Sequence, residues 1–258
     1  MNRSFICFIA LLMSAASLSV MFLHRSIDPG GGRLDKLPKV ILWAWERPED
    51  LRFIDVHEAG VAFLVKTIYL DGNRVEERPR LQPLRVPDHT SLLGVVRIET
   101  RHLSPVPDSL MTRKVTAEIL QVARMAGLTA IQVDFDAVRS ERAFYAGLIR
   151  DIRRGLPDSM GLSVTALASW CYDDRWLDGL PLDEAVPMLF RMGVDHDRIV
   201  RRLLDRREFS LSVCRKSVGI STDETLPYIP PNRRTYVFNP RSWSLESYTQ
   251  VMKKAGQQ

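Results

Sequence analysis

The stretch Leu128-Thr129-Ala130-Ile131-Gln132-Val133-Asp134-Phe135-Asp136 decides the expected fold. It follows Gly127 and reads as a buried β-strand, whose side chains alternate between two faces. The predicted apolar face holds Ile131, Val133 and Phe135, and the opposite face holds Gln132, Asp134 and Asp136. An apolar face packs against helices, whereas a line of polar side chains needs a polar interior. Two carboxylates at the carboxyl end of such a strand are typical of barrel enzymes.

Short apolar runs elsewhere in the chain alternate with helical patterns. The other predicted strands are 40–45, 61–70, 93–98, 162–168, 185–190, 217–220 and 235–238, and the clearest predicted helices are 107–126, 140–156, 196–208 and 244–254. Strands separated by helices indicate a parallel sheet. Eight strands in roughly 220 residues predict an α/β fold, a single (β/α)8 TIM barrel of small size. The second unit is expected to be irregular, because residues 71–90 are rich in charge and proline.

Length and composition are those of an ordinary globular protein. The chain has 258 residues, of which 45% are hydrophobic and 26% charged, which suits one large domain or two small ones. The net charge of +5 is only mildly basic, and the arginines are scattered without interleaved aromatic residues. We therefore expect no nucleic-acid partner.

The amino-terminal segment predicts export. Residues 5–23 are apolar apart from Ser14, Ser17 and Ser19, and as a helix they would span about 28 Å, close to the thickness of a bilayer core. Two alternatives remain open for residues 1–25: an uncleaved hydrophobic helix that anchors the chain in a membrane, or a cleaved signal peptide. Either alternative makes the protein exported, anchored facing the periplasm or exterior, or secreted.

A flexible linker is expected between this segment and the barrel. Residues 26–38 contain Pro29 and the run Gly30-Gly31-Gly32, which break regular structure. The barrel domain would then occupy residues 39–258.

The cysteines suggest no metal site. Cys7 belongs to the apolar segment, which leaves Cys171 and Cys214 for the domain. These two could pair in an oxidising compartment, although the sequence alone cannot bring them together. No cysteine or histidine spacing is typical of zinc, and an Asp-x-Asp pair inside a barrel lacks the loop context of a cation site. We expect no metal and no cofactor.

Polar side chains stand at the end of most predicted strands. If the strands close into a barrel, their carboxyl ends meet at one mouth, where barrel enzymes carry their chemistry. Tryptophan faces stack on sugar rings, while carboxylates bind hydroxyls and perform acid/base catalysis. The predicted catalytic residues are Asp136, Asp134 and Glu99, and the predicted substrate-binding residues are Trp170, Arg191, Glu46 and Asn239.

Several of these segments resemble a bacterial family catalogued only as a domain of unknown function (family 3142). The residues that carry the resemblance are Gln132-Val133-Asp134-Phe135-Asp136, Tyr145-Ala146, 162–170, Trp43-Ala44-Trp45-Glu46 and Met188-Leu189-Phe190-Arg191-Met192-Gly193. The resemblance covers residues 40–195, and more loosely the rest. That family is grouped with barrel glycoside hydrolases, so the resemblance implies a glycoside-hydrolase-like barrel with a carbohydrate polymer or oligosaccharide as its partner.

The fourth predicted strand is also distantly similar to that of chitinase-like barrels, Asp-x-x-Asp-x-Asp-x-Glu. Asp134 and Asp136 match the two inner acids, but Ile131 stands at the first acid position and Val138 at that of the catalytic Glu. The chitinase mechanism needs that Glu as its proton donor and is therefore not expected here. A hydrolase would have to use Glu99, Glu46 or Glu224 as the acid, with Asp136 as nucleophile or base and Asp134 beneath it.

These residues also have structural interpretations. Arg97 and Asp134 stand at comparable depth on adjacent predicted strands, so they could form a buried ion pair that only fills the barrel. Arg191 could bind an acidic sugar or neutralise nearby acids. If Trp43 and Trp45 face inward, Glu46 points away from the pocket.

Two functions follow from the sequence. The leading hypothesis is an exported glycoside-hydrolase-like protein that acts on a cell-envelope or environmental polysaccharide. The alternative is a non-catalytic glycan-binding barrel that serves as an envelope accessory protein. Val138 in place of Glu favours the alternative, and the acids at other strand ends favour the enzyme.

Overall fold

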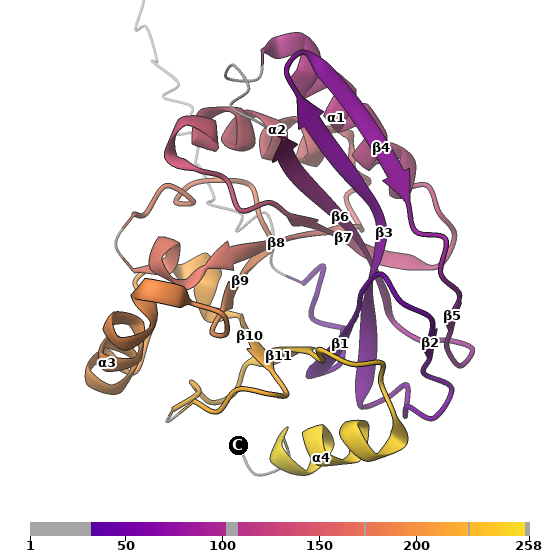
Figure 1. Ribbon diagram of the computed structural model, residues 1–258, viewed down its shortest axis with the longest axis vertical. Coiled ribbons are helices and arrows are strands. Elements are labelled where there is room, and N and C mark those ends of the chain that lie inside the picture. The colour runs from indigo at the N-terminus through magenta and orange to yellow at the C-terminus, as the bar shows by residue number, and fades with distance from the viewer. Residues whose placement is uncertain (1–31, 102–107, 173, 227, 256–258) are drawn as a thin grey trace, which may run out of the picture.

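Eight parallel strands form a closed barrel, as predicted (Figure 1). The computed structural model describes residues 32–101, 108–172, 174–226 and 228–255. The barrel strands are β1 (Val40–Ala44), β3 (Ala59–Asp71), β6 (Leu92–Arg101), β7 (Leu128–Asp134), β8 (Gly161–Leu167), β9 (Glu184–Met188), β10 (Ser217–Ser221) and β11 (Arg234–Phe238). Strand β1 pairs with both β3 and β11, which closes the barrel.

The four predicted helices are present. They are α1 (Ser109–Val122), α2 (Arg142–Gly155), α3 (His196–Arg206) and α4 (Leu245–Ala255). Their apolar residues recur at helical spacing, as in α1, where Met111, Val115 and Ile119 are buried. The Asp108 carboxylate accepts a 2.8 Å hydrogen bond from the N–H of Met111 and caps α1, which satisfies a donor that the helix itself leaves unpaired.

The remaining connections depart from a regular (β/α)8 repeat. In the described part of the chain, no α-helix follows β1, β3, β8 or β10. Two short strands, β2 (Glu49–Asp50) and β5 (Leu84–Arg85), pair with each other. The other connections contain β4 (Arg74–Pro79) and the 3-10 helices η1 (Arg139–Glu141), η2 (Ala168–Cys171), η3 (Gly193–Asp195) and η4 (Ser212–Arg215).

Strands β3 and β6 extend beyond their neighbours at the carboxyl end of the barrel. The last residue of β1, Ala44, pairs with Phe63 of β3, and the last residue of β7, Asp134, pairs with Arg97 of β6. Strand β4 pairs antiparallel with the free length of β3. Residues 66–71, 74–79 and 97–101 thus form a three-stranded extension, here named the projecting sheet.

The core has the two faces that the sequence of β7 predicts. Ile131, Val133 and Phe135 pack outward in a cluster that includes buried residues of α1 and α2. Gln132 faces the barrel interior, where its side chain accepts a 2.7 Å hydrogen bond from the indole N–H of Trp43 and donates to Ser163. The alternation of the strand therefore sends Asp134 toward the interior as well.

Residues 33–37, which belong to the predicted linker, close the barrel at the amino ends of its strands. Leu34 and Leu37 are buried in the interior cluster, and Leu34 fills the space beside Gly161 at the start of β8. Arg33 donates to the Asp158 carbonyl and to the Asp183 carboxylate. These contacts make residues 33–37 part of the barrel.

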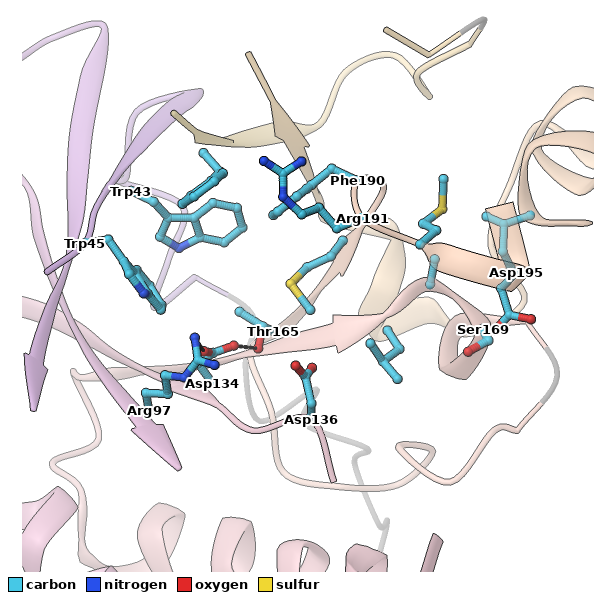
Figure 2. A pocket seen from close by; sticks show the side chains of 16 residues that line it. Trp43, Trp45, Arg97, Asp134, Asp136, Thr165, Ser169, Phe190, Arg191 and Asp195 are labelled. Atoms are coloured by element: carbon cyan, nitrogen blue, oxygen red, sulfur yellow. Dashed lines mark hydrogen bonds and ion pairs between the residues drawn. The ribbon is translucent and has the colours of Figure 1, made fainter. Parts of the chain in front are cut away.

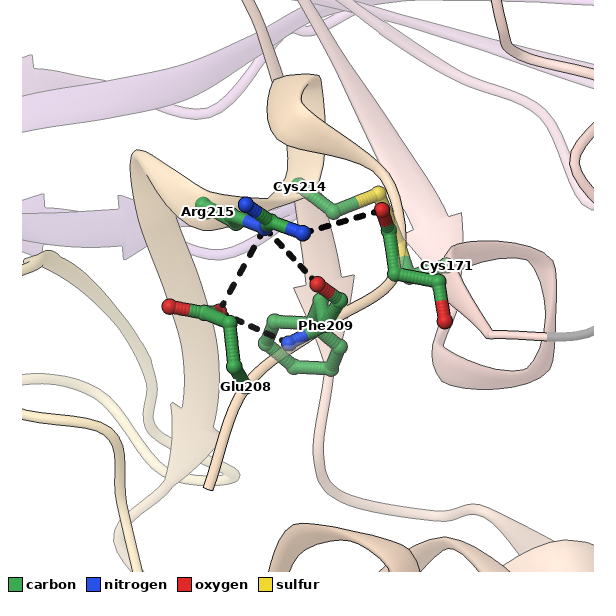
Figure 3. The surroundings of a disulfide bond; sticks show 6 residues. Cys171, Glu208, Phe209, Cys214 and Arg215 are labelled. Carbon is green, nitrogen blue, oxygen red and sulfur yellow. Dashed lines mark hydrogen bonds and ion pairs between the residues drawn. A yellow bond between two sulfur atoms is a disulfide. The ribbon is translucent and has the colours of Figure 1, made fainter. Parts of the chain in front are cut away.

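Cys171 and Cys214 form a disulfide (Figure 3). It joins η2, after β8, to η4, before β10. Both cysteines are fully buried, and the carbonyl of Cys171 accepts hydrogen bonds from the N–H groups of Ser210 and Leu211. The disulfide therefore fixes the segment after β8 to the segment that follows α3.

The predicted anchor or signal, residues 1–25, lies outside the described residues. Within the part of the chain that the structure describes, no helix has the length and apolar character needed to cross a bilayer.

Candidate functional site

A pocket of about 340 Å³ opens at the carboxyl ends of the barrel strands (Figure 2). Its volume lies in the range of small-molecule sites. The pocket is lined by Trp43, Trp45, Arg97, Asp134, Asp136, Thr165, Leu167, Ala168, Ser169, Met188, Phe190, Arg191, Met192, Asp195, Ile199 and Phe238. This is the end of the barrel at which the sequence predicts the chemistry.

Asp134 and Asp136 lie together on one side of the pocket (Figure 2). Asp134 is the deeper of the two, being 8% exposed, and its Oδ1 accepts a 2.6 Å hydrogen bond from the Thr165 hydroxyl on β8. Asp136 follows the end of β7. Among the described residues, none forms a hydrogen bond or ion pair with the Asp136 carboxylate, which faces the cavity. Its oxygens are thus available to a ligand.

Burial favours the protonated form of both acids. The pKa of Asp134 is raised to about 6, mainly by burial and to a smaller extent by the negative charge of Asp136, while the Thr165 hydrogen bond opposes the shift. Burial also raises the pKa of Asp136, and the positive charge of Arg97 opposes this. Two neighbouring carboxyls whose environments separate their protonation behaviour are the usual basis of acid/base chemistry.

Arg97 links the pocket to Glu99. Its Nε lies 2.6 Å from the Glu99 carboxylate, whereas its Nη1 lies 3.8 Å from Asp134. Glu99 does not line the pocket. The predicted Arg97–Asp134 pair therefore exists as a loose contact, and the guanidinium is engaged more closely by Glu99 than by the acid in the pocket.

Arg191 is placed at the pocket as predicted, but it is held by two acids. Its guanidinium lies 3.0 Å from Asp223 and 2.6 Å from Glu224, and its backbone N–H also donates to Glu224. Hydrogen bonds from Ser221 and Arg191 lower the pKa of Asp223. This pairing connects the end of β9 to the segment after β10 and favours the neutralising role for Arg191.

Aromatic rings line the side of the pocket opposite the two acids (Figure 2). Phe190 and Phe238 stack with nearly parallel planes and centroids 5.6 Å apart, and Trp43 contacts Phe190. The Arg97 guanidinium lies 5.8 Å from the Trp45 ring. The inward orientation of Trp43 and Trp45 also explains why Glu46 lies outside the pocket, where it pairs with Arg78.

Two other predicted substrate-binding residues are placed elsewhere. Trp170 is 2% exposed and packs edge-on against Trp176 in the outer core, so the prediction of a stacking platform at this position is wrong. The polypeptide turns into η2 directly after β8, which directs Trp170 away from the mouth. Asn239 is 7% exposed and accepts from the Thr222 hydroxyl, which fixes the loop after β11.

Several pocket residues were not among the predicted site residues. Thr165 alternates with buried apolar residues on β8 and resembles ordinary strand filling in the sequence. Phe190 belongs to a segment that carries the family resemblance, whereas Phe238 ends a strand and Asp195 precedes a helix without a motif. Inward parity along β8 and β11 was the available signal for Thr165 and Phe238.

Position 138 carries no acid in the structure either. The Val138 side chain is 59% exposed, and its N–H donates to Glu141 in the first turn before α2. Among the described residues, no group of three or more histidines, cysteines or acids is arranged to hold a metal ion.

No family model matches the chain, and no curated protein matches it. A crystal structure of the Bacillus cereus spore cortex-lytic enzyme SleL is similar over 85% of this chain, with a TM-score of 0.47 and 16% identity. The chain spans 58% of the length of that enzyme.

Proposed function

We propose that the protein binds a glycan at the barrel mouth and hydrolyses a glycosidic bond with Asp136 and Asp134. The observation that carries this proposal is the available Asp136 carboxylate in a pocket whose opposite side is aromatic. Aromatic faces suit the apolar faces of sugar rings, while a carboxylate beside them can reach hydroxyls or the reacting carbon. Most glycoside hydrolases use one protonated and one ionised carboxyl group.

The two acids divide these roles by their environment. Asp134 is buried, and burial raises its pKa to about 6, whereas the Asp136 carboxylate faces the cavity. Asp136 is thus suited to act as nucleophile or base, and Asp134 to hold a proton in mildly acidic solution. The earlier candidates for the acid, Glu99, Glu46 and Glu224, are each ion-paired with an arginine, and none of the three lines the pocket.

The proposal includes action outside the cytosol. The Cys171–Cys214 disulfide supports this part, since such bonds persist in oxidising compartments. The apolar run 5–23 also supports it. A polysaccharide of the cell envelope or the surroundings would be the natural substrate there.

The experiment is a glycan hydrolysis screen of the full chain, purified in detergent, beside Asp136→Asn. The panel includes neutral, amino-sugar and uronic-acid polymers. The substitution keeps the shape of the side chain, and Asp178→Asn, at an exposed site outside the pocket, serves as the matched control. Turnover in the wild type and the control, with a loss of at least about a thousandfold in Asp136→Asn, supports the proposal.

A non-catalytic glycan receptor is the second candidate. The pairing of Glu99 and Glu224 with arginines and the absence of an acid at Val138 favour it. Binding of a glycan without cleavage, weakened in Asp136→Asn, would establish this function in place of hydrolysis. If the protein neither cleaves nor binds any glycan of the panel, both candidate functions are contradicted.

A further inference from the structure

The projecting sheet has one apolar face and one polar face. On the apolar face Ile68, Leu70, Val96 and Ile98 are buried in the cluster that also holds residues of α1. The residues that alternate with them form cross-strand rows, since paired residues on adjacent strands share a face. The rows are Arg78–Thr67–Arg97, Glu76–Tyr69–Glu99 and Arg74–Asp71–Arg101.

This polar face is continuous with the pocket. Arg97 belongs to the first row and also lines the cavity. From Arg97 to Arg101 the face continues for about 13 Å, at roughly 3.3 Å per residue. A ligand that leaves the pocket past Trp45 and Arg97 therefore meets these rows rather than open solvent.

The charged side chains on the polar face are held in place while they remain accessible. The Tyr69 ring is 7% exposed, and the guanidiniums of Arg101 and Arg78 lie 3.5 Å and 5.7 Å from its centroid. Ion pairs link Arg97 to Glu99, Arg101 to Glu76 and Arg78 to Glu46, and these side chains are 36% to 55% exposed. A preorganised surface loses less conformational entropy when it binds a ligand.

The charges on this surface balance one another. Arg97, Arg101 and Arg78 each stand beside a glutamate, and Arg74 lies 3.7 Å from Asp71. The surface therefore offers no excess charge to an anionic or cationic polymer. It offers alternating hydrogen-bond donors and acceptors at short spacing. Hydroxyl groups, which both donate and accept, match this pattern.

We propose that the polar face of the projecting sheet, together with Glu46, which pairs with Arg78, binds the continuation of a glycan chain beyond the pocket. The charged side chains of this surface, here named the shelf, are Glu46, Glu76, Arg78, Arg97, Glu99 and Arg101. The substrate is then an extended, uncharged glycan rather than a monosaccharide or disaccharide. Asp136 lies between the Trp45–Arg97 end of the pocket and its Ser169–Asp195 end (Figure 2), so such a chain passes over the acids. This inference rests on the proposed function.

The test measures affinity against chain length by calorimetry, with the full chain in detergent. The probes are cello-oligosaccharides and chito-oligosaccharides from disaccharide to hexasaccharide, with the Asp136→Asn background used to prevent cleavage. The shelf variant is Arg101→Ala with Glu76→Ala, which removes a half-exposed ion pair and leaves the net charge unchanged. The control removes the exposed pair Arg154 and Asp151 of α2 in the same way.

On the unsubstituted shelf, affinity for one ladder should rise about tenfold from trisaccharide to hexasaccharide, the worth of one or two hydrogen bonds. The shelf variant should lose this rise and keep its affinity for the trisaccharide, while the control keeps both. Glu99→Gln, closer to the pocket, should lose part of the rise.

Two outcomes overturn the inference and differ from each other. Binding that does not grow with chain length, or that grows equally in the shelf variant, overturns the shelf and leaves the proposed function standing. No binding of either ladder, together with no hydrolysis in the polymer screen, overturns the proposed function and the shelf with it.

Discussion

The hydroxyl of Thr165 on β8 donates a 2.6 Å hydrogen bond to Oδ1 of Asp134 on the adjacent strand β7. The hydrogen bond stabilises the ionised carboxylate, whereas burial and the charge of Asp136 destabilise it, and the second influence dominates. Asp134 thus keeps its proton in mildly acidic solution because of its position in the barrel. The hydrogen bond from Thr165 limits how far the pKa of Asp134 is raised.

Thr165→Val should raise the pKa of Asp134 above about 6, because the substitution removes the hydrogen bond that lowers it. If Asp134 supplies the proton for hydrolysis, the loss of activity on the alkaline side should move to higher pH in parallel. A carbon NMR titration of labelled aspartate measures the pKa directly. Thr116→Val, whose hydroxyl donates within α1, is the control, and an unchanged Asp134 titration in Thr165→Val would contradict the assignment.

Asp134→Asn should stabilise the fold at about pH 7 and leave it unchanged at about pH 4. The folded-state pKa of about 6 exceeds the ordinary value of 3.8, so the folded state binds the proton more tightly than the unfolded chain. Stability is therefore lost as the pH rises through this interval, by up to about 3 kcal/mol. Asparagine resembles the protonated acid and removes this loss. Urea unfolding at the two pH values measures it, and equal gains at both would refute the pKa shift as the cause.

Replacing Cys171 and Cys214 together by alanine should lower the free energy of unfolding by about 4 kcal/mol. The bond closes a loop with a sequence separation of 43 residues, which limits the freedom of the unfolded chain. Because both cysteines are fully buried, the native protein should resist reductant until it unfolds. Urea unfolding with and without reductant checks both statements, and identical midpoints would mean that the bond does not form.

Trp45→Ala should weaken glycan binding, whereas Trp170→Phe should lower the stability of the fold. Trp45 lines the pocket, so its truncation should weaken glycan binding about tenfold with little change in stability. Trp170 is buried against Trp176, so its replacement should lower stability by about 1–2 kcal/mol and leave binding unchanged. Calorimetric binding and thermal unfolding of both variants test this. Weaker binding in Trp170→Phe alone would restore Trp170 as a stacking residue.

The barrel could be predicted because short stretches of sequence encode its strands and helices. Alternation in β7 separated Ile131, Val133 and Phe135 from Gln132 and Asp134, and the two sets lie on the expected faces. Apolar spacing and end signals likewise located the four helices.

The details of the mouth depend on contacts that sequence spacing does not encode. Trp170 is directed away from the pocket by the turn into η2, and Glu99 is engaged by Arg97 on its own strand. The length of β3 beyond β1 depends on the partner that β4 supplies. Strand parity identifies which side chains face inward, but it cannot say which of two inward acids an arginine binds.

The position of residues 33–37 gives the barrel a direction. Their contacts with Asp158, Gly161 and Asp183 are at the amino ends of the strands, whereas the pocket is at the carboxyl ends. A surface attached to the chain ahead of residue 32 would therefore face the amino ends of the strands, and the pocket would open away from that surface. The length of the barrel strands would then separate the surface of attachment from a polymer bound at the pocket.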